Sequence, residues 1–299
     1  MINNVKAFIL FIVFFCSIEA GGKEDHLVTY RFNGGRFGDN LMIYLSALYF
    51  SHQNGIPLLY KSFPNSQYLK LSSYGYHGEI TQKQIKVVDE RLLGASFSLA
   101  KMKRSTLFIV PIDFWQHVKF VDAKFKNLAK KLVSPNVQLK LVEPPKDSIS
   151  VAIHWRQGGG FDKDGWELDF PLKCPNREFY IEAFATVLNQ FPDEKIYCHI
   201  FTDAQLPDIL AEELRSIFPD KEKITFNVRQ GENRHDKNVL EDFFSMMNFD
   251  ILIRPNSNLS RVAAKIHDFL MVCYPAEYRI ENKKVVITKI AYESVGIGF

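Results

Sequence analysis

The chain has 299 residues, of which 46% are hydrophobic and 24% are charged, so it can bury a large core in one large domain or two medium ones. Its net charge of +3 is small and its lysines and arginines are scattered, which excludes the basic surface expected of a nucleic-acid-binding protein. The composition also excludes a disordered, collagenous or repetitive chain.

The N-terminus differs from the rest of the chain. Lys6 precedes the wholly apolar residues 7–15, and Ser17-Ile-Glu-Ala20 then leads to Gly21 and Gly22. This order is typical of a secretory signal peptide, so we expect residues 1–20 to be a cleaved signal or a short membrane anchor. The apolar stretch is shorter than the about twenty residues of a comfortable membrane span, which favours cleavage. Membrane contact is expected only through residues 7–18, if they stay attached.

A glycine-rich loop lies close to the N-terminus of the remaining chain. Residues 26–32 alternate as a strand does, the loop 33–40 follows, and residues 41–49 form an apolar helix that Asp39 or Asn40 can cap. This order presents free N–H groups at a helix N-terminus, where anions bind. Glycine loops of this kind are common, so the loop alone is a weak sign of a binding site.

The rest of the first half is less regular. Strands are predicted at 56–60 and 106–111, with an irregular insertion at 63–94 between them. The aromatic residues 114–115 either stack on a sugar or, more commonly for such clusters, pack in the core. A helix is predicted at 122–132.

Two prolines within residues 142–147 stop helix and strand alike, and this stretch is the best candidate for a linker. We therefore predict two Rossmann-like lobes, one at 26–145 and the other at 148–292.

The second half alternates between strands and helices. Strands are predicted at 149–153, 195–201, 224–228 and 251–254, and helices at 176–191, 206–218, 239–247 and 260–270. Repeated units of this length predict an α/β fold with a parallel, doubly wound sheet. Such sheets bind ligands at the carboxyl ends of their strands, where the chain carries His154, Arg156, Asp203 and the loop 256–258.

The segment around Arg156 is the strongest candidate for an anion site. A guanidinium offers a planar fork of donors, and the glycines at 158–160 allow backbone N–H groups to approach a phosphate. Taken alone, the segment fits a surface His and Arg on a flexible loop equally well. No spacing of cysteine or histidine resembles a metal site.

Separate segments of the chain resemble the fucosyltransferase superfamily, which includes α-1,2-, α-1,6- and protein O-fucosyltransferases. They are the glycine loop and helix start at 34–44, His154-Trp155-Arg156, the strand end at 201–203, and residues 241–264, in the family's order. The resemblance implies a GT-B-like fold with an acceptor-side first lobe and a donor-binding second lobe. It also implies inverting transfer of fucose from GDP-fucose to a glycan hydroxyl, α-1,2-like and without a metal or other cofactor.

The resemblance further implies roles for individual residues. Arg156 is expected to hold the β-phosphate of the leaving diphosphate, and His154 to contact the ribose or a phosphate. Further donor contacts are implied for Gly34, Gly35 and Gly38 along the cleft, Asp203 as a structural or ribose partner, Asp242 at the guanine edge, and Ser257 and Asn258 on the diphosphate.

Some positions depart from the family pattern. Gln157 stands where a second Arg is usual, and Gly159 stands where an acid is common. For the general base we predict Asp164, with Glu167 and Asp39 as alternatives. The departures keep two other functions open, namely a different GT-B nucleotide-sugar transferase and a non-catalytic sugar-binding relative. The N-terminal segment favours a secretory, Golgi-like lumen, or a secreted or periplasmic location. If the segment is not cleaved, it would anchor the protein to the membrane.

Overall fold

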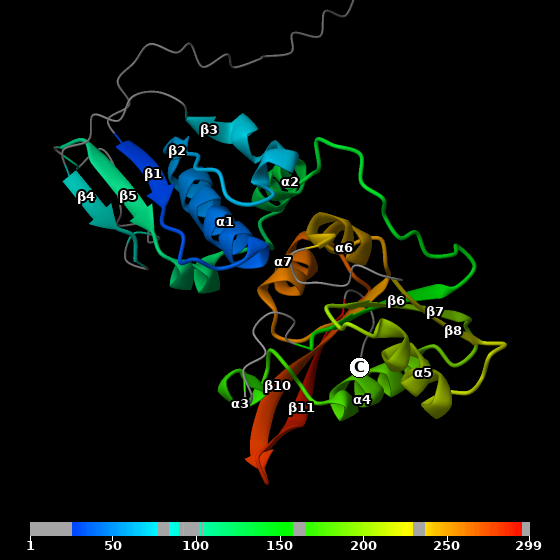
Figure 1. Cartoon of the computed structure of the whole chain (residues 1–299). Coiled ribbons are helices and arrows are strands. Elements are labelled where there is room, and N and C mark those ends of the chain that lie inside the picture. The colour runs from blue at the N-terminus through cyan, green and yellow to red at the C-terminus, as the bar shows by residue number, and fades with distance from the viewer. Residues whose placement is uncertain are drawn as a thin grey trace, which may run out of the picture.

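The computed structural model describes residues 26–76, 84–89, 92, 102, 104–157, 166–229 and 237–294. They form two α/β lobes, each built around a mostly parallel sheet (Figure 1). The strands of the first sheet come from residues 26–110 and those of the second from residues 149–294. The predicted α/β class with two Rossmann-like lobes is confirmed, and the boundaries at 145 and 148 stay a prediction.

The first sheet has five parallel strands in the order β3-β2-β1-β5-β4. Its strands are β1 (His26–Tyr30), β2 (Leu58–Leu59), β3 (Gly75–Tyr76), β4 (Gln84–Val87) and β5 (Thr106–Val110). The helices of this lobe are α1 (Phe37–Asn54) and α2 (Ala123–Leu132), with short 3-10 helices at Ser66–Tyr68, Lys70–Tyr74 and Ile112–His117.

The second sheet has six strands in the order β11-β10-β9-β6-β7-β8. They are β6 (Ile149–Trp155), β7 (Ile196–Thr202), β8 (Ile224–Val228), β9 (Ile251–Ile253), β10 (Met271–Glu281) and β11 (Lys284–Ser294). All neighbours are parallel except β10 and β11, which form an antiparallel hairpin. The chain moves outward from β6 in one direction and then returns to β9 on the other side, so the topological switch point lies between β6 and β9.

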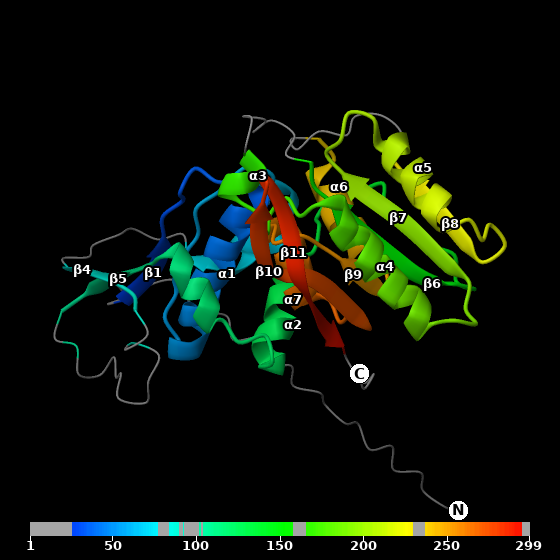
Figure 2. The ribbon, with the colours of Figure 1, turned by 90° about the horizontal axis from the view of Figure 1, so that it is seen from below.

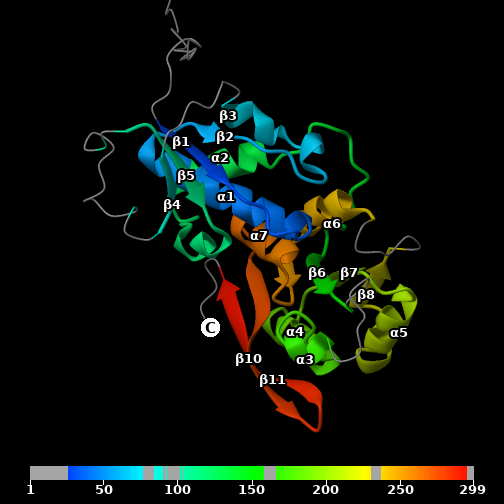
Figure 3. The same cartoon turned by 60° about the vertical axis from the view of Figure 1, so that its left-hand side comes forward.

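Helices cover both faces of the second sheet. The helices α4 (Arg177–Gln190) and α5 (Pro207–Ile217) lie on one face, and α6 (Val239–Met246) and α7 (Asn258–Ile266) lie on the other, toward the first lobe (Figures 1 and 3). Because helices cover both faces of the sheet, side chains on both sides of β6 are buried, and its sequence is nearly continuously apolar. Its Val151 and Ile153 join the α4 and α5 core, and Ala152 joins the core under α6. The short helix α3 (Trp166–Asp169) precedes α4.

A continuous hydrophobic core joins the two lobes. Phe37 and Leu41 of α1 belong to the same buried cluster as Phe243 of α6 and Val262 and Ile266 of α7. The Phe37 and Phe243 rings meet edge to face with their centroids 5.7 Å apart. The helices α6 and α7 therefore serve both the second sheet and the first lobe.

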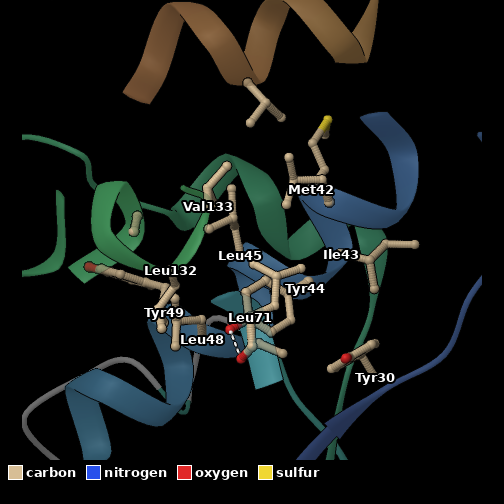
Figure 4. Packing of buried hydrophobic residues seen from close by; sticks show 14 of the residues in the cluster. Tyr30, Met42, Ile43, Tyr44, Leu45, Leu48, Tyr49, Leu71, Leu132 and Val133 are labelled. Carbon is tan, nitrogen blue, oxygen red and sulfur yellow. Dashed lines mark hydrogen bonds between the residues drawn. The ribbon is translucent and has the colours of Figure 1, made fainter. Parts of the chain in front are cut away.

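The first-lobe part of this core surrounds α1. Figure 4 shows Met42, Leu45 and Leu48 of α1 together with Val133 at the end of α2. The Tyr44 hydroxyl is buried there and donates a hydrogen bond to the carbonyl of Leu71 at 3.1 Å. The view from below in Figure 2 shows α1, α7 and α2 close together between the two sheets.

The start of α1 differs from the prediction. The helix begins at Phe37 rather than residue 41, and Arg36 is its N-cap residue. Asp39 lies in the first turn and accepts the N–H of Arg36 at 3.0 Å, which is one half of a capping box. Naming Asp39 or Asn40 as the cap was therefore wrong, because Asp39 satisfies the backbone from inside the helix.

Other predicted elements agree with the structure to within a few residues. The aromatic cluster lies in the core, since Phe114 is 2% exposed and Trp115 is 7% exposed. The sequence prediction lacked β3, β4 and the β10–β11 hairpin. In the described part of the chain no helix is both long and apolar enough to cross a membrane. The predicted signal or anchor at 1–20 lies outside the described residues.

Candidate functional site

The carboxyl ends of β6, β7 and β9 form one rim beside the switch point. Ile153 of β6 is in register with Ile253 of β9, and Trp155 of β6 is in register with Thr202 of β7. The residues that follow these strands are therefore neighbours. Of the predicted site residues, the structure places His154, Arg156, Asp203 and Ser257 at this rim.

His154 is a half-buried polar group of the rim. Its Nδ1 atom is buried and has no hydrogen-bond partner in the described part of the chain. Burial lowers the pKa of His154 to about 3, and the nearby charges of Arg156 and Arg254 act in the same direction. The imidazole is therefore neutral at physiological pH, so it can exchange hydrogen bonds with a ligand but brings no charge.

The backbone that carries Arg156 is fixed from two sides. The Arg156 N–H donates to the Tyr180 hydroxyl at 3.4 Å, and the Tyr180 ring stacks on Trp155 with a centroid distance of 4.2 Å. The Gln157 N–H donates to Oδ1 of Asp203 at 2.7 Å. Asp203 therefore braces the loop after β6.

Asp242 forms part of an acidic pair around one arginine. It lies in the first turn of α6, and Arg229, which follows β8, donates to its Oδ1 at 2.7 Å. Arg229 also donates to Glu241 Oε2 at 3.1 Å. Burial raises the pKa of Asp242 to about 6, and the charge of Arg229 only partly opposes this. Asp242 therefore loses its charge closer to neutral pH than an exposed aspartate does.

The N-terminus of α7 lies against the first lobe. Its N-cap residue Ser257 is 5% exposed and makes no side-chain capping bond, so the first N–H groups of the helix lack that partner. The Asn258 side chain donates to the carboxylate of Asp39 in the first turn of α1. Both helix N-termini therefore meet at the same seam between the lobes, where their positive dipole ends favour an anion.

The three glycines predicted to line the cleft differ in how much space surrounds them. Gly34 has φ of +76° with open space around it. A Cβ on Gly35 would lie 2.5 Å from the Asp39 Cβ, and a Cβ on Gly38 would lie 2.5 Å from the Leu259 nitrogen. Gly38 therefore permits the close approach of α1 and α7, a packing requirement that the sequence prediction did not anticipate.

Arg254 is a rim residue that the sequence prediction missed. It follows β9 directly, is 5% exposed, and its guanidinium lies over the Tyr274 ring at 4.7 Å from the centroid. An apolar strand that ends in an arginine was visible in the sequence, as it was for Arg156. The sequence pattern predicts Arg254 as the last residue of the strand, whereas the structure ends the strand at Ile253.

Some predicted residues are not positioned by the structure. Asp164, Gly158, Gly159 and Gly160 lie outside the described residues. The alternative base Glu167 is exposed on α3, and Asp39 is engaged with Arg36 and Asn258. Within the described ranges no group of three or more His, Cys, Asp or Glu side chains is arranged to hold a metal ion.

Comparisons with known proteins agree on the fold. No protein-family model and no curated protein sequence matches the chain. A mutant of Arabidopsis thaliana FUT1 in complex with GDP is 12% identical, with a TM-score of 0.54 over 89% of this chain and 73% of that one. POFUT1 in complex with GDP-fucose is 11% identical, with a TM-score of 0.49 over 84% of this chain and 96% of that one.

NodZ, a fucosyltransferase from Bradyrhizobium, is 10% identical, with a TM-score of 0.47 over 91% of this chain and 99% of that one. At such identities a structural likeness shows the fold alone, and of these three structures FUT1 has a TM-score above 0.5. The chain has the GT-B-like, two-lobed α/β fold of the fucosyltransferase FUT1.

Proposed function

We propose that the chain is an inverting glycosyltransferase that transfers fucose from GDP-fucose to a hydroxyl of a glycan, without a metal. The observation that carries the proposal is the rim at the switch point, where Arg156, neutral His154 and the N-terminus of α7 converge. This is the position at which open α/β sheets bind ligands, and its positive character suits a diphosphate. The FUT1 structure with the same fold is in complex with GDP, which supports a guanosine nucleotide as the donor.

In this proposal the second lobe holds the donor. Arg156 and the first N–H groups of α7 bind the diphosphate, His154 contacts the ribose or a phosphate, and Asp242 accepts hydrogen bonds from the guanine edge. As the bond from C1 of fucose to the diphosphate oxygen breaks, negative charge grows on the leaving group. A fixed guanidinium stabilises that charge more in the transition state than in the bound donor, which lowers the barrier.

The acceptor is proposed to approach from the first lobe. Its hydroxyl oxygen forms the new bond to C1 on the opposite face of the sugar, so the configuration inverts, and its proton passes to a base. Asp164 is the residue proposed for this base. The α-1,2 linkage is proposed from the resemblance alone. The segment at 1–20 supports a secretory, Golgi-like lumen, or a secreted or periplasmic location, with membrane contact through 7–18 if the segment is retained.

The test is a calorimetric titration of the chain with GDP and with UDP. We expect GDP to bind and UDP to bind at least about tenfold more weakly, because only guanine offers adjacent N–H donors to Asp242. Arg156→Ala is expected to weaken GDP binding by about 10- to 100-fold, the usual worth of charge-assisted bonds. Arg279→Ala, on the exposed part of the β10–β11 hairpin, is the matched control and is expected to bind like the wild type. Binding of UDP and not GDP would point to a different nucleotide-sugar transferase.

A further inference from the structure

One row of side chains crosses the second sheet at its carboxyl edge. Ile153, Ile253 and Cys273 are in register on neighbouring strands, so His154, Arg254 and Tyr274 follow side by side. Side chains one position further on point to the opposite face, and these three therefore lie on the face that carries α6 and α7. The row is continuous with the rim that holds Arg156.

Arg254 is the buried cation of this row. Only 5% of the residue is exposed, and its Nη1 donates to the carbonyl of Pro255 at 3.2 Å. Its guanidinium stacks on Tyr274, while its Nε atom is buried and has no hydrogen-bond partner in the described part of the chain. A guanidinium has five N–H donors, so most of its capacity is left for other groups.

Glu293 is the carboxylate whose charge acts on Arg254, but its oxygens bind other groups. Glu293 accepts a hydrogen bond from the Tyr274 hydroxyl at 3.0 Å and an ion pair from Lys265 at 3.2 Å. Among the described residues no carboxylate forms an ion pair with Arg254. Burying a charge with no carboxylate in direct contact is costly, which makes a site for an external anion the simplest account of this arginine.

Neighbouring charges make the positive potential stronger. Burial lowers the pKa of Arg254 to about 10, repulsion from Arg261 on α7 acts in the same direction, and Glu293 and Tyr274 oppose the two. Arg254 and Arg156 also both depress the pKa of His154, so their charges reach the same buried spot. The N-terminus of α7 begins four residues after Arg254 and adds its positive dipole end.

We infer that Arg254 is a second phosphate-binding residue, which together with Arg156 holds the diphosphate of the nucleotide sugar. Arg156 and Arg254 follow the two strands that flank the switch point, so they can approach one diphosphate from two sides. Gln157, the residue after Arg156, is uncharged, and Arg254 supplies a second positive charge from another strand. The inference rests on the proposed function, since it takes the ligand of that site to be a nucleoside diphosphate.

The experiment compares three ligands on the full chain: GDP, guanosine and inorganic pyrophosphate. Arg254→Gln is expected to weaken GDP and pyrophosphate by about 10- to 100-fold and to leave guanosine binding within about twofold of the wild type. Arg254→Lys keeps the charge, and its affinities for GDP and pyrophosphate are expected to lie between those of the wild type and of Arg254→Gln. Arg279→Gln, an exposed arginine on the hairpin, is the matched control and is expected to change none of the three affinities.

The outcomes separate this inference from the proposed donor. Equal weakening of GDP and guanosine by Arg254→Gln overturns the inference, because a structural role affects both ligands alike. Unchanged pyrophosphate affinity overturns it as well. Binding of UDP but not GDP by the wild type, with pyrophosphate binding still dependent on Arg254, overturns the fucose donor and supports the inference. A wild type that binds no diphosphate overturns both.

A thermal-shift measurement tests the inference if Arg254→Gln does not fold. If Arg254→Gln does not give a cooperative melting transition, the thermal shift produced by pyrophosphate is compared between the wild type and Arg254→Lys. A shift that is smaller in the Lys variant, with an unchanged shift for guanosine, supports phosphate contact. Equal pyrophosphate shifts in the two proteins overturn it.

Discussion

His154 and Asp242 have unusual protonation states for opposite reasons. Burial and two arginines hold the pKa of His154 at about 3, so its imidazole stays neutral at every pH at which the protein would be assayed. Burial raises the pKa of Asp242 to about 6, so this carboxylate titrates within the working range. A pH dependence of ligand binding between pH 5 and 7 is therefore assigned to Asp242 and not to His154.

The affinity for guanosine is expected to depend on pH through Asp242, because guanosine lacks the terminal phosphate of GDP, which itself titrates at about pH 6. If ionised Asp242 accepts hydrogen bonds from guanine, binding is strongest above its pKa of about 6 and falls as the pH drops below that value. A fall of about tenfold between pH 7 and pH 5 is expected, because one unit below the pKa about nine tenths of the groups are protonated. Calorimetric titrations at pH 5, 6 and 7.5 measure this directly.

Asp242→Asn is the matching variant. It keeps the shape of the side chain and removes the titration of Asp242, so guanosine binding is expected to be weak and independent of pH over this range. The bond to Arg229 is retained only through the amide oxygen. If the asparagine variant kept the pH dependence of the wild type, Asp242 would not be the group that reads the base.

Residues at strand ends were the most predictable part of the site. His154, Arg156 and Asp203 follow from a simple rule, since polar residues directly after apolar strands gather at one edge of a parallel sheet. Arg254 obeys the same rule but was missed, because a three-residue strand offers too short a pattern to fix where the strand ends. The bond from Gln157 to Asp203 could not be predicted, because it depends on how two loops meet.

The junction of α1 and α7 positions the site. Gly38 lies so close to α7 that a Cβ there would meet the Leu259 nitrogen at 2.5 Å and the Leu259 Cα at 2.8 Å. These are backbone atoms, which cannot rotate away as a flexible side chain can. Any larger residue at this position must move α7, and with it the N–H groups proposed to bind the diphosphate.

Gly38→Ala is therefore expected to lower the free energy of unfolding by about 1–3 kcal/mol, the usual cost of overpacking. It is also expected to weaken GDP binding by displacing the N-terminus of α7. Gly55→Ala is the matched control, since it places an alanine at φ of +64° in open space at the C-terminal end of α1 and strains only the backbone, by about 1–2 kcal/mol. Chemical denaturation and GDP titration of both variants test this. A Gly38→Ala protein with wild-type stability and affinity would contradict the role given to the junction.

Elements with strong patterns were predicted well, and those without were missed. The apolar run of β6 and the 3.6-residue pattern of α5, with Leu210, Ala211 and Leu214 buried, define themselves within a short stretch of sequence. The two-residue strands β2 and β3 carry almost no local signal, and β3 exists because β2 offers it a pairing edge. The β10–β11 hairpin lacks a clear apolar pattern, because many of its residues are charged or exposed. Only the start of β10 is buried against the rest of the sheet.

The two lobes share one core. The buried cluster that contains α1 also contains side chains of α6 and α7, so the site is formed at a packed junction. Polar contacts add to it, because Lys126 and Lys130 of α2 form ion pairs with Asp268 just after α7. The Val142 N–H, next to the predicted linker, donates to Ser245 Oγ on α6 at 2.9 Å. The relation between the lobes depended on contacts far apart in the sequence, and no local pattern could predict it.

Turnover is the property that needs the whole molecule, because the donor is proposed to lie on the second lobe and the acceptor to enter from the first. The most direct measurement is hydrolysis of GDP-fucose in the absence of an acceptor, followed as release of GDP and free fucose by the chain from residue 21 onward. Slow release is expected for this protein, and a rate lower by about 100-fold or more for Arg156→Ala, which removes stabilisation of the leaving diphosphate. Equal release by both proteins, or release from a uridine diphosphate sugar and none from GDP-fucose, would contradict the proposed function.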